Sequence, residues 1–125
     1  MEKVIYPELS YKIVGILFEV YNSLGPGYQE KYYQKAIALA LAENKIKFKV
    51  EVPITINFKG NKIGQYFLDF LIEEKIILEI KKGNYFSKKN IEQVYAYLRV
   101  TELKLAILAN FTSTGIKFCR ILNLR

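Results

Sequence analysis

Apolar residues near the start of the chain recur at intervals of three and four, which is typical of a helix with one buried face. Residues 8–24 carry such a stripe, and Gly25-Pro26-Gly27 ends it because proline cannot continue a helix. The same spacing predicts a second helix over residues 28–44. Its buried side is expected to comprise Tyr33, Ile37, Ala40 and Leu41.

After residue 46 the pattern changes to strict alternation of apolar and polar residues, which is typical of half-buried strands. Residues 47–58, 63–72 and 76–82 are predicted as three strands. Short polar turns at 59–62 and 73–75 separate them. Turns this short join antiparallel neighbours, so the three strands are expected to form a meander.

The remaining sequence returns to helix and then to strand. Residues 87–100 are predicted as a helix with Ser87 as its N-cap. The continuous apolar run 103–109 predicts a strand buried on both faces, and 115–122 the last strand. The order ααβββαββ predicts an α/β (α+β) domain over residues 1–125, with a central mixed β-sheet, antiparallel hairpins and flanking helices.

Composition narrows the class of protein. The chain has 125 residues, 51% of them apolar and 25% charged, which are the values of one globular domain. No apolar run is long enough to span a membrane, so we expect no membrane partner. The N-terminal residues lack the apolar core of a secretion signal, which predicts a cytoplasmic location.

Two rare residue types restrict the possible chemistry. The chain has no histidine, which excludes Ser-His-Asp and Cys-His nucleophile systems and histidine-rich zinc sites. Its one cysteine, Cys119, cannot form an internal disulfide and is expected to be a small buried side chain. Carboxylates, lysines, tyrosines and a hard cation remain as the means of catalysis.

The net charge of +7 favours an anionic partner such as a nucleic acid, although a lysine-rich solvated surface would give the same charge. Only three of the 19 basic residues are arginine, which favours contact with a phosphate backbone over base recognition. Lys82, Lys88 and Lys89, with Tyr85 and Phe86 among them, suit a nucleic-acid strand. They would equally suit an exposed helix start.

Three charged residues interrupt the second and third predicted strands. Alternation places Glu79 and Lys81 on one face, and a turn centred near Glu74 places Asp69 opposite Glu79. Two facing carboxylates destabilise a sheet unless a positive charge compensates them. Mg²⁺ would do so, since it binds through one or two carboxylates and a substrate phosphate. The alternative is an exposed ion pair at a strand end.

These residues belong to a longer set of motifs. Gly27 to Tyr33 reads G-x-x-E-x-x-Y around Glu30, Asp69 precedes Glu79-Ile80-Lys81, and Gln93 and Tyr97 form Q-x-x-x-Y. Over residues 8–122 the pattern resembles the GxxExxY family of the PD-(D/E)XK nuclease superfamily. Tyr21 departs from it, because such sequences often carry histidine there.

The resemblance implies a restriction-endonuclease-like core and a nuclease that needs Mg²⁺, with Mn²⁺ as a possible substitute. Asp69, Glu79 and the carbonyl of Ile80 would hold the metal, Lys81 would activate or position the attacking water, and Glu30 would assist from the second helix. Gln93 and Tyr97 would support the site. DNA is expected as the substrate rather than RNA, and a homodimer is compatible with this activity.

Other interpretations stay open for the same residues. Glu30 would also be favoured in a first helical turn by the helix dipole, Gln93 could be solvated and Tyr97 could be ordinary packing. The whole chain could instead be a non-catalytic module that binds nucleic acid or protein, or a structural protein whose carboxylates form ion pairs.

Overall fold

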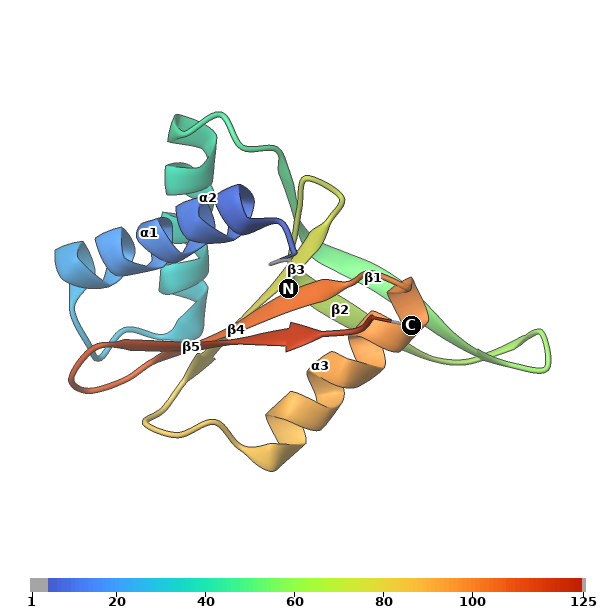
Figure 1. Cartoon of the computed structure of the whole chain (residues 1–125). Coiled ribbons are helices and arrows are strands. Elements are labelled where there is room, and N and C mark those ends of the chain that lie inside the picture. Colours follow the sequence, from blue (N-terminus) through green and yellow to red (C-terminus); the bar gives the residue numbers. More distant parts are fainter. Residues whose placement is uncertain (1–4, 125) are drawn as a thin grey trace.

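The structure is a computed structural model that describes residues 5–124. Five strands form one mixed sheet in the order β1-β2-β3-β4-β5, and helices cover both of its faces (Figure 1). The element order ααβββαββ and the mixed sheet confirm the predicted fold class. The elements are α1 (Pro7–Leu24), α2 (Glu30–Glu43), β1 (Phe48–Phe58), β2 (Asn61–Ile72), β3 (Ile76–Lys82), α3 (Lys88–Thr101), β4 (Leu105–Phe111) and β5 (Ile116–Leu122).

Neighbouring strands of the sheet are antiparallel, except for the parallel pair β3 and β4. β1, β2 and β3 form the predicted antiparallel meander, α3 crosses over the sheet, and β4 then pairs parallel to β3. β5 returns antiparallel to β4. Every residue of β4 is buried, because it lies between two strands and under helices on both faces. No helix within residues 5–124 is long and apolar enough to cross a membrane.

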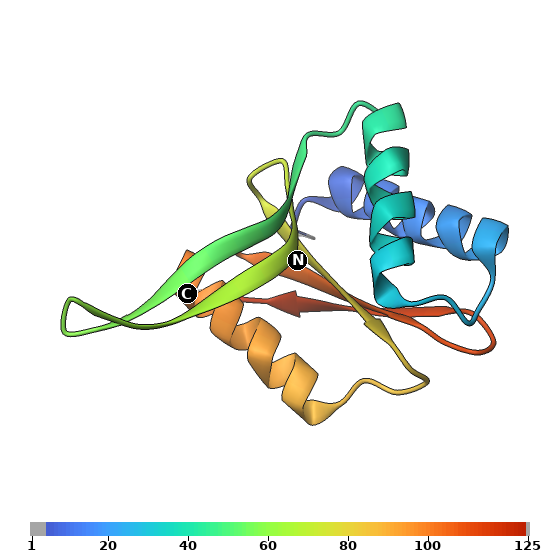
Figure 2. The same ribbon diagram turned by 180° about the vertical axis from the view of Figure 1, so that it is seen from behind.

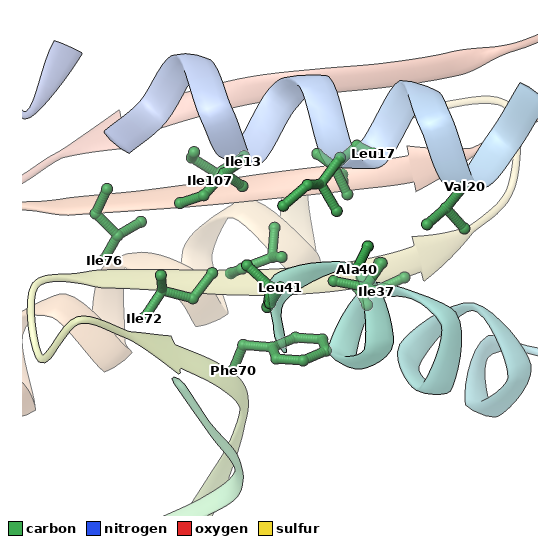
Figure 3. Packing of buried hydrophobic residues seen from close by; sticks show 14 of the residues in the cluster. Ile13, Leu17, Val20, Ile37, Ala40, Leu41, Phe70, Ile72, Ile76 and Ile107 are labelled. Carbon is green, nitrogen blue, oxygen red and sulfur yellow. The ribbon is translucent and has the colours of Figure 1, made fainter. Parts of the chain in front are cut away.

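One face of the sheet is covered by α1 and α2. Their apolar stripes pack on the even-numbered residues of β3 and on β4, as the predicted helical spacing requires. Figure 3 shows part of this first cluster: Ile13, Leu17, Val20, Ile37, Ala40, Leu41, Phe70, Ile72, Ile76 and Ile107. Tyr33 stacks on Phe111 with ring centroids 4.0 Å apart, and its hydroxyl donates to the Gly25 carbonyl at 2.6 Å.

The opposite face is covered by α3, whose Ser87 N-cap side chain accepts from the Asn90 N–H, as predicted. A second, smaller cluster lies between this helix and the sheet: Leu68, Ile77, Val94, Tyr97, Leu98, Ala106, Leu108 and Ile121. Cys119 packs against this cluster but is only half-buried, which corrects the expectation of a fully buried cysteine. Its partial burial raises the pKa of the thiol.

The predicted alternation along β2 is wrong at one position. Strict alternation along β2 would place Leu68, Phe70 and Ile72 on one face, but Leu68 joins the second cluster while Phe70 and Ile72 join the first. The cause is a break in strand pairing at Asp69. Val50 pairs with Phe70 and Val52 with Leu68, yet the pair between them is missing from the ladder. Glu51, its β1 member, has a left-handed φ of 51°.

Beyond this break the β1–β2 hairpin continues as a two-stranded ribbon that projects from the rest of the fold (Figure 2). It closes at Lys59-Gly60, where both residues have positive φ, 50° and 80°. Two positive φ values are required by the type I′ turn, whose twist matches that of the flanking strands. The ribbon therefore leaves the sheet at Asp69 and ends in a tight turn.

Candidate active site

The candidate site lies where β2 and β3 separate. The two strands pair over only three residue pairs, from Ile72–Ile76 to Phe70–Leu78. β3 continues for four more residues, to Lys82, paired with β4 alone. The edge of β3 that faced β2 thus loses its partner strand, and its backbone N–H groups need other acceptors.

Two carboxylates replace the missing strand. Asp69 Oδ2 accepts from the Ile80 N–H at 2.8 Å, and Glu79 Oε2 accepts from the Asp69 N–H at 3.0 Å. The structure thus places Asp69 opposite Glu79, which is the position that the length of the β2–β3 turn predicts. The reciprocal bonds hold both side chains at the separation point of the strands.

Glu79 is buried, with 4% of its surface exposed. Desolvation is the main cause that raises its pKa, to about 9, and the hydrogen bond and negative charge of Asp69 add to it. The charge of Lys81 acts in the opposite direction. Without a cation, Glu79 therefore holds a proton at neutral pH.

Gln34 of α2 supports the break from the other side. Its Nε2 donates to the Asp69 carbonyl at 3.3 Å and to Glu51 Oε1 at 3.0 Å. Gln34 thereby donates hydrogen bonds to the backbone carbonyl and to the carboxylate that lie at the interruption of the ladder. Sequence reasoning missed Gln34, and the only available signal was its position one helical turn after Glu30.

Glu30 lies farther along the same free edge. It is exposed, and its Oε2 accepts from the Lys82 N–H at 3.0 Å. The N–H and C=O of one strand residue point to the same side, so the Ile80 carbonyl lies on this edge between the carboxylates of Asp69 and Glu30. The expectation that Glu30 reaches this region from the second helix agrees with its position. However, no group of three acidic or other metal-ligating side chains gathers anywhere in residues 5–124.

Lys81 is half-buried and lies on the same face of β3 as Glu79. Its neighbour across the parallel pair is Asn110 of β4. The Asn110 Nδ2 donates to the carbonyls of Gly83 and Tyr85, at 3.3 and 2.8 Å, and so fixes the loop that leaves β3. Asn110 was also missed, since nothing in the sequence pairs it with that loop.

α3 closes the site with Tyr97. This side chain is buried and contacts Tyr66 edge-on, with ring centroids 4.9 Å apart. Burial and the charges of Glu79 and Asp69 raise the pKa of the Tyr97 hydroxyl. Gln93, one turn earlier, is half-buried rather than fully solvated.

The predicted basic residues are all exposed. Lys82 Nζ donates to the Gly27 carbonyl at 3.4 Å, and Lys88 lies 3.9 Å from Glu92, while Lys89 lies at the start of α3 on the stripe of Gln93. The structure adds one lysine that sequence reasoning missed. Lys117 of β5 lies 5.6 Å from the ring of Tyr85, which is 83% exposed.

Tyr21 stands where related sequences were expected to carry histidine. Its hydroxyl donates to the Thr112 carbonyl at 2.8 Å, and its ring contacts Phe111. The tyrosine thus joins the end of α1 to the β4–β5 turn, which is a structural contact.

The donor atoms at the separation point suit a hard divalent cation. Asp69 and Glu79 supply carboxylate oxygens and Ile80 a backbone carbonyl, which are the ligand types that Mg²⁺ and Mn²⁺ prefer. With only two acids present, the other coordination positions fall to water or substrate oxygens, as is usual for Mg²⁺. The burial of an acidic side chain, Glu79, beside Asp69 is the observation that a cation would explain.

Comparison with known proteins gives three results. A model of the PD-(D/E)XK nuclease superfamily matches residues 7–121, from the first residue of α1 into β5. No curated protein matches the chain. Among solved structures, the chain is similar to the crystal structure of SSO0001. That similarity has 19% identity, covers 94% of this chain and 78% of the other, and has a TM-score of 0.49.

Proposed function

Because the chain belongs to the PD-(D/E)XK nuclease superfamily, we propose that it hydrolyses phosphodiester bonds in nucleic acid, with DNA rather than RNA as its substrate. We further propose that it belongs to the GxxExxY group, whose signature it carries at Gly27, Glu30 and Tyr33. Mg²⁺ is the proposed cofactor, and Mn²⁺ its substitute.

The observation that carries this proposal is the pair of buried Glu79 and half-buried Asp69, which are joined by reciprocal hydrogen bonds at the strand end. Placing two carboxylates opposite each other at a strand end costs the fold several kcal/mol unless a charge compensates them. Asp69, Glu79 and the Ile80 carbonyl would hold the cation. A divalent metal bound there would polarise the phosphate and lower the pKa of a coordinated water.

Lys81 is the proposed catalytic lysine. It lies on the Glu79 face of β3, and no hydrogen bond or ion pair within residues 5–124 occupies its ammonium group. The group is therefore available to orient the attacking water or to stabilise charge on the phosphate. Glu30, bonded to the Lys82 N–H, is proposed to position the end of β3 rather than to act on the substrate.

Tyr97 and Gln93 are proposed as supporting residues on α3. The raised pKa of the Tyr97 hydroxyl keeps it protonated at neutral pH, so that it can donate a hydrogen bond beside the two acids. Lys82, Lys88, Lys89 and Lys117 are proposed to contact phosphates, and the exposed ring of Tyr85 offers a surface on which a base can stack.

Cleavage assays test this proposal directly. Wild-type protein is incubated with Mg²⁺ or Mn²⁺ and linear, supercoiled, single-stranded or branched DNA, or RNA. The variants Glu79→Ala and Lys81→Ala are expected to lose roughly 10²-fold or more of the cleavage rate, the scale of losing one electrostatic group of an active site. Lys104→Ala, an exposed lysine before β4, is the matched control and is expected to cut normally.

Each other outcome has a defined meaning. Cleavage that survives in both site variants would exclude Glu79 and Lys81 as the active residues. Binding of DNA without cleavage by folded wild-type protein would favour the non-catalytic module. Cleavage of RNA alone would retain the site but overturn the proposed substrate.

A further inference from the structure

The β1–β2 ribbon projects away from the helices, and the described structure places no element against its outer face (Figures 1 and 2). Large apolar side chains are exposed along it: Phe58 is 60% exposed, Ile63 is 67% exposed and Phe67 is 54% exposed. Its inner face, by contrast, includes Val52 and Tyr66, which pack against the cluster under α3. The exposed residues are thus not needed for the core.

The charge on the ribbon has one sign. Between Glu51 and Asp69 the sequence contains no acidic residue, and its two charged side chains there are Lys59 and Lys62, beside the turn. The remaining polar groups near the tip are neutral hydrogen-bonding side chains: Asn57, Asn61 and Gln65. Lysines beside amides and exposed apolar groups match the chemistry of a duplex, with its phosphates, base edges and sugars.

The position of the ribbon relative to the acids supports the same partner. Asp69 lies at its base, and the turn lies about eight residues farther along β2, a span of roughly 26 Å at 3.3 Å per residue. A DNA duplex rises about 3.4 Å per base pair, so this span covers roughly eight base pairs. A two-stranded ribbon also fits the major groove of B-DNA, whereas the deep major groove of RNA helices excludes it.

We propose that the ribbon tip, residues 57–63, binds a groove of duplex DNA roughly eight base pairs from the phosphate held at Asp69 and Glu79. Lys59 and Lys62 contact phosphates, and Phe58 and Ile63 lie against sugars and bases. The inference rests on the proposed action on nucleic acid and adds a second contact region that gives the protein a preference for longer duplexes.

The test removes the tip charges and leaves the turn intact. The double variant Lys59→Asn/Lys62→Gln keeps the hairpin, because asparagine accepts the positive φ of residue 59. The matched control, Lys12→Gln/Lys104→Gln, removes one exposed lysine from α1 and one from the loop before β4. Binding to a hairpin duplex of 4 base pairs, too short to reach the tip from the acids, and to a duplex of 24 base pairs is measured without metal at several salt concentrations.

The tip variant is expected to bind the 24-base-pair duplex about 10-fold more weakly than wild type. Its slope of log K against log salt should fall by about 1.8, since each lost phosphate contact contributes about 0.9. Binding to the 4-base-pair duplex should change less than about 2-fold, because charges more than a Debye length from the duplex are largely screened. The control variant should keep the wild-type preference for the longer duplex.

Three results would overturn the inference: equal weakening on both duplexes, no weakening on either, or loss of a wild-type dimer in the tip variant by sedimentation. The last would assign the ribbon to a second copy of the chain. The inference and the proposed function fail separately. Duplex binding that weakens in the tip variant, without any cleavage, contradicts the nuclease but supports the ribbon. Cleavage and binding that are unchanged in the tip variant contradict the ribbon alone.

Discussion

The two halves of β3 differ in what surrounds them. Ile76, Ile77 and Leu78 have a partner strand on each side and are completely buried. Glu79 to Lys82 keep β4 but lose β2, and carboxylates from Asp69 and Glu30 accept their free N–H groups. One strand of seven residues thus passes from an apolar core into a polar edge.

The difference shows how a small fold can place acids in its interior. A carboxylate that accepts a backbone N–H does the work of a missing carbonyl, so the strand end stays hydrogen-bonded without a neighbour. The same arrangement leaves Glu79 buried beside Asp69, which makes this half the less stable one. The comparison predicts separate effects of substitution in the two halves.

The largest effect on stability is expected in the doubly paired half. Leu78→Ala removes a completely buried side chain and should lower the free energy of unfolding by about 3 kcal/mol. Lys81→Ala, in the open half, should lower it by less than about 1 kcal/mol because the side chain is only half-buried. Urea denaturation of both variants measures the difference, and equal losses would contradict it.

A smaller effect, with the opposite sign, is expected at Glu79. Its folded-state pKa of about 9 lies above the ordinary 4.5, so the metal-free protein should lose stability as pH rises between these values. Glu79→Gln removes that dependence and should make the metal-free protein more stable than wild type at pH 8. The groups facing Glu79 are Asp69, Lys81 and Tyr97.

Thermal unfolding at pH 5 and pH 8 measures this effect, and Glu92→Gln, an exposed acid of α3, is the control. A wild-type protein whose stability is unchanged between the two pH values would show that Glu79 is ionised without a cation. Added Mg²⁺ should stabilise wild type and leave Glu79→Gln nearly unaffected, because metal binding needs the carboxylate.

The smallest effect is expected where α2 supports the break. Gln34→Ala leaves the Asp69 carbonyl and Glu51 without their shared donor and should cost about 1 kcal/mol. Gln29→Ala, at an N-cap whose side chain makes no cap hydrogen bond, is the matched control. Calorimetry with Mn²⁺ should also show weaker binding to Gln34→Ala, and unchanged binding would mean that Asp69 needs no support from α2.

Most of the fold could be predicted from the sequence because local spacing decides it. The apolar stripes of α1 and α3, the alternation of β3 and the Ser87 cap all depend on residues within a few positions of one another. The β2 alternation could not be predicted beyond Asp69. The pairing of β2 with β1 is interrupted there, where Glu51 has a left-handed φ and Gln34 of α2 donates to the Asp69 carbonyl, and both residues are distant in sequence.

The candidate site was predictable to a similar extent. Asp69 and Glu79 face each other because the β2–β3 turn is short, which is a local property. The position of Glu30 on the Lys82 N–H depends on how α2 docks, and the roles of Asn110 and Lys117 depend on strands that come later in the sequence. Contacts between residues that are distant in sequence cannot be predicted from the local spacing of apolar and polar residues.

The stacking of Tyr33 on Phe111 has a consequence for the order in which the nascent chain folds. Roughly eighty residues separate the two rings, and ribosomes add about 5–20 residues per second. Phe111 of β4 is therefore made roughly 4–16 s after Tyr33 of α2. During that interval the apolar stripes of α1 and α2 have no β4 to cover. The cluster under α1 and α2 is therefore completed only when β4 has been made, late in synthesis.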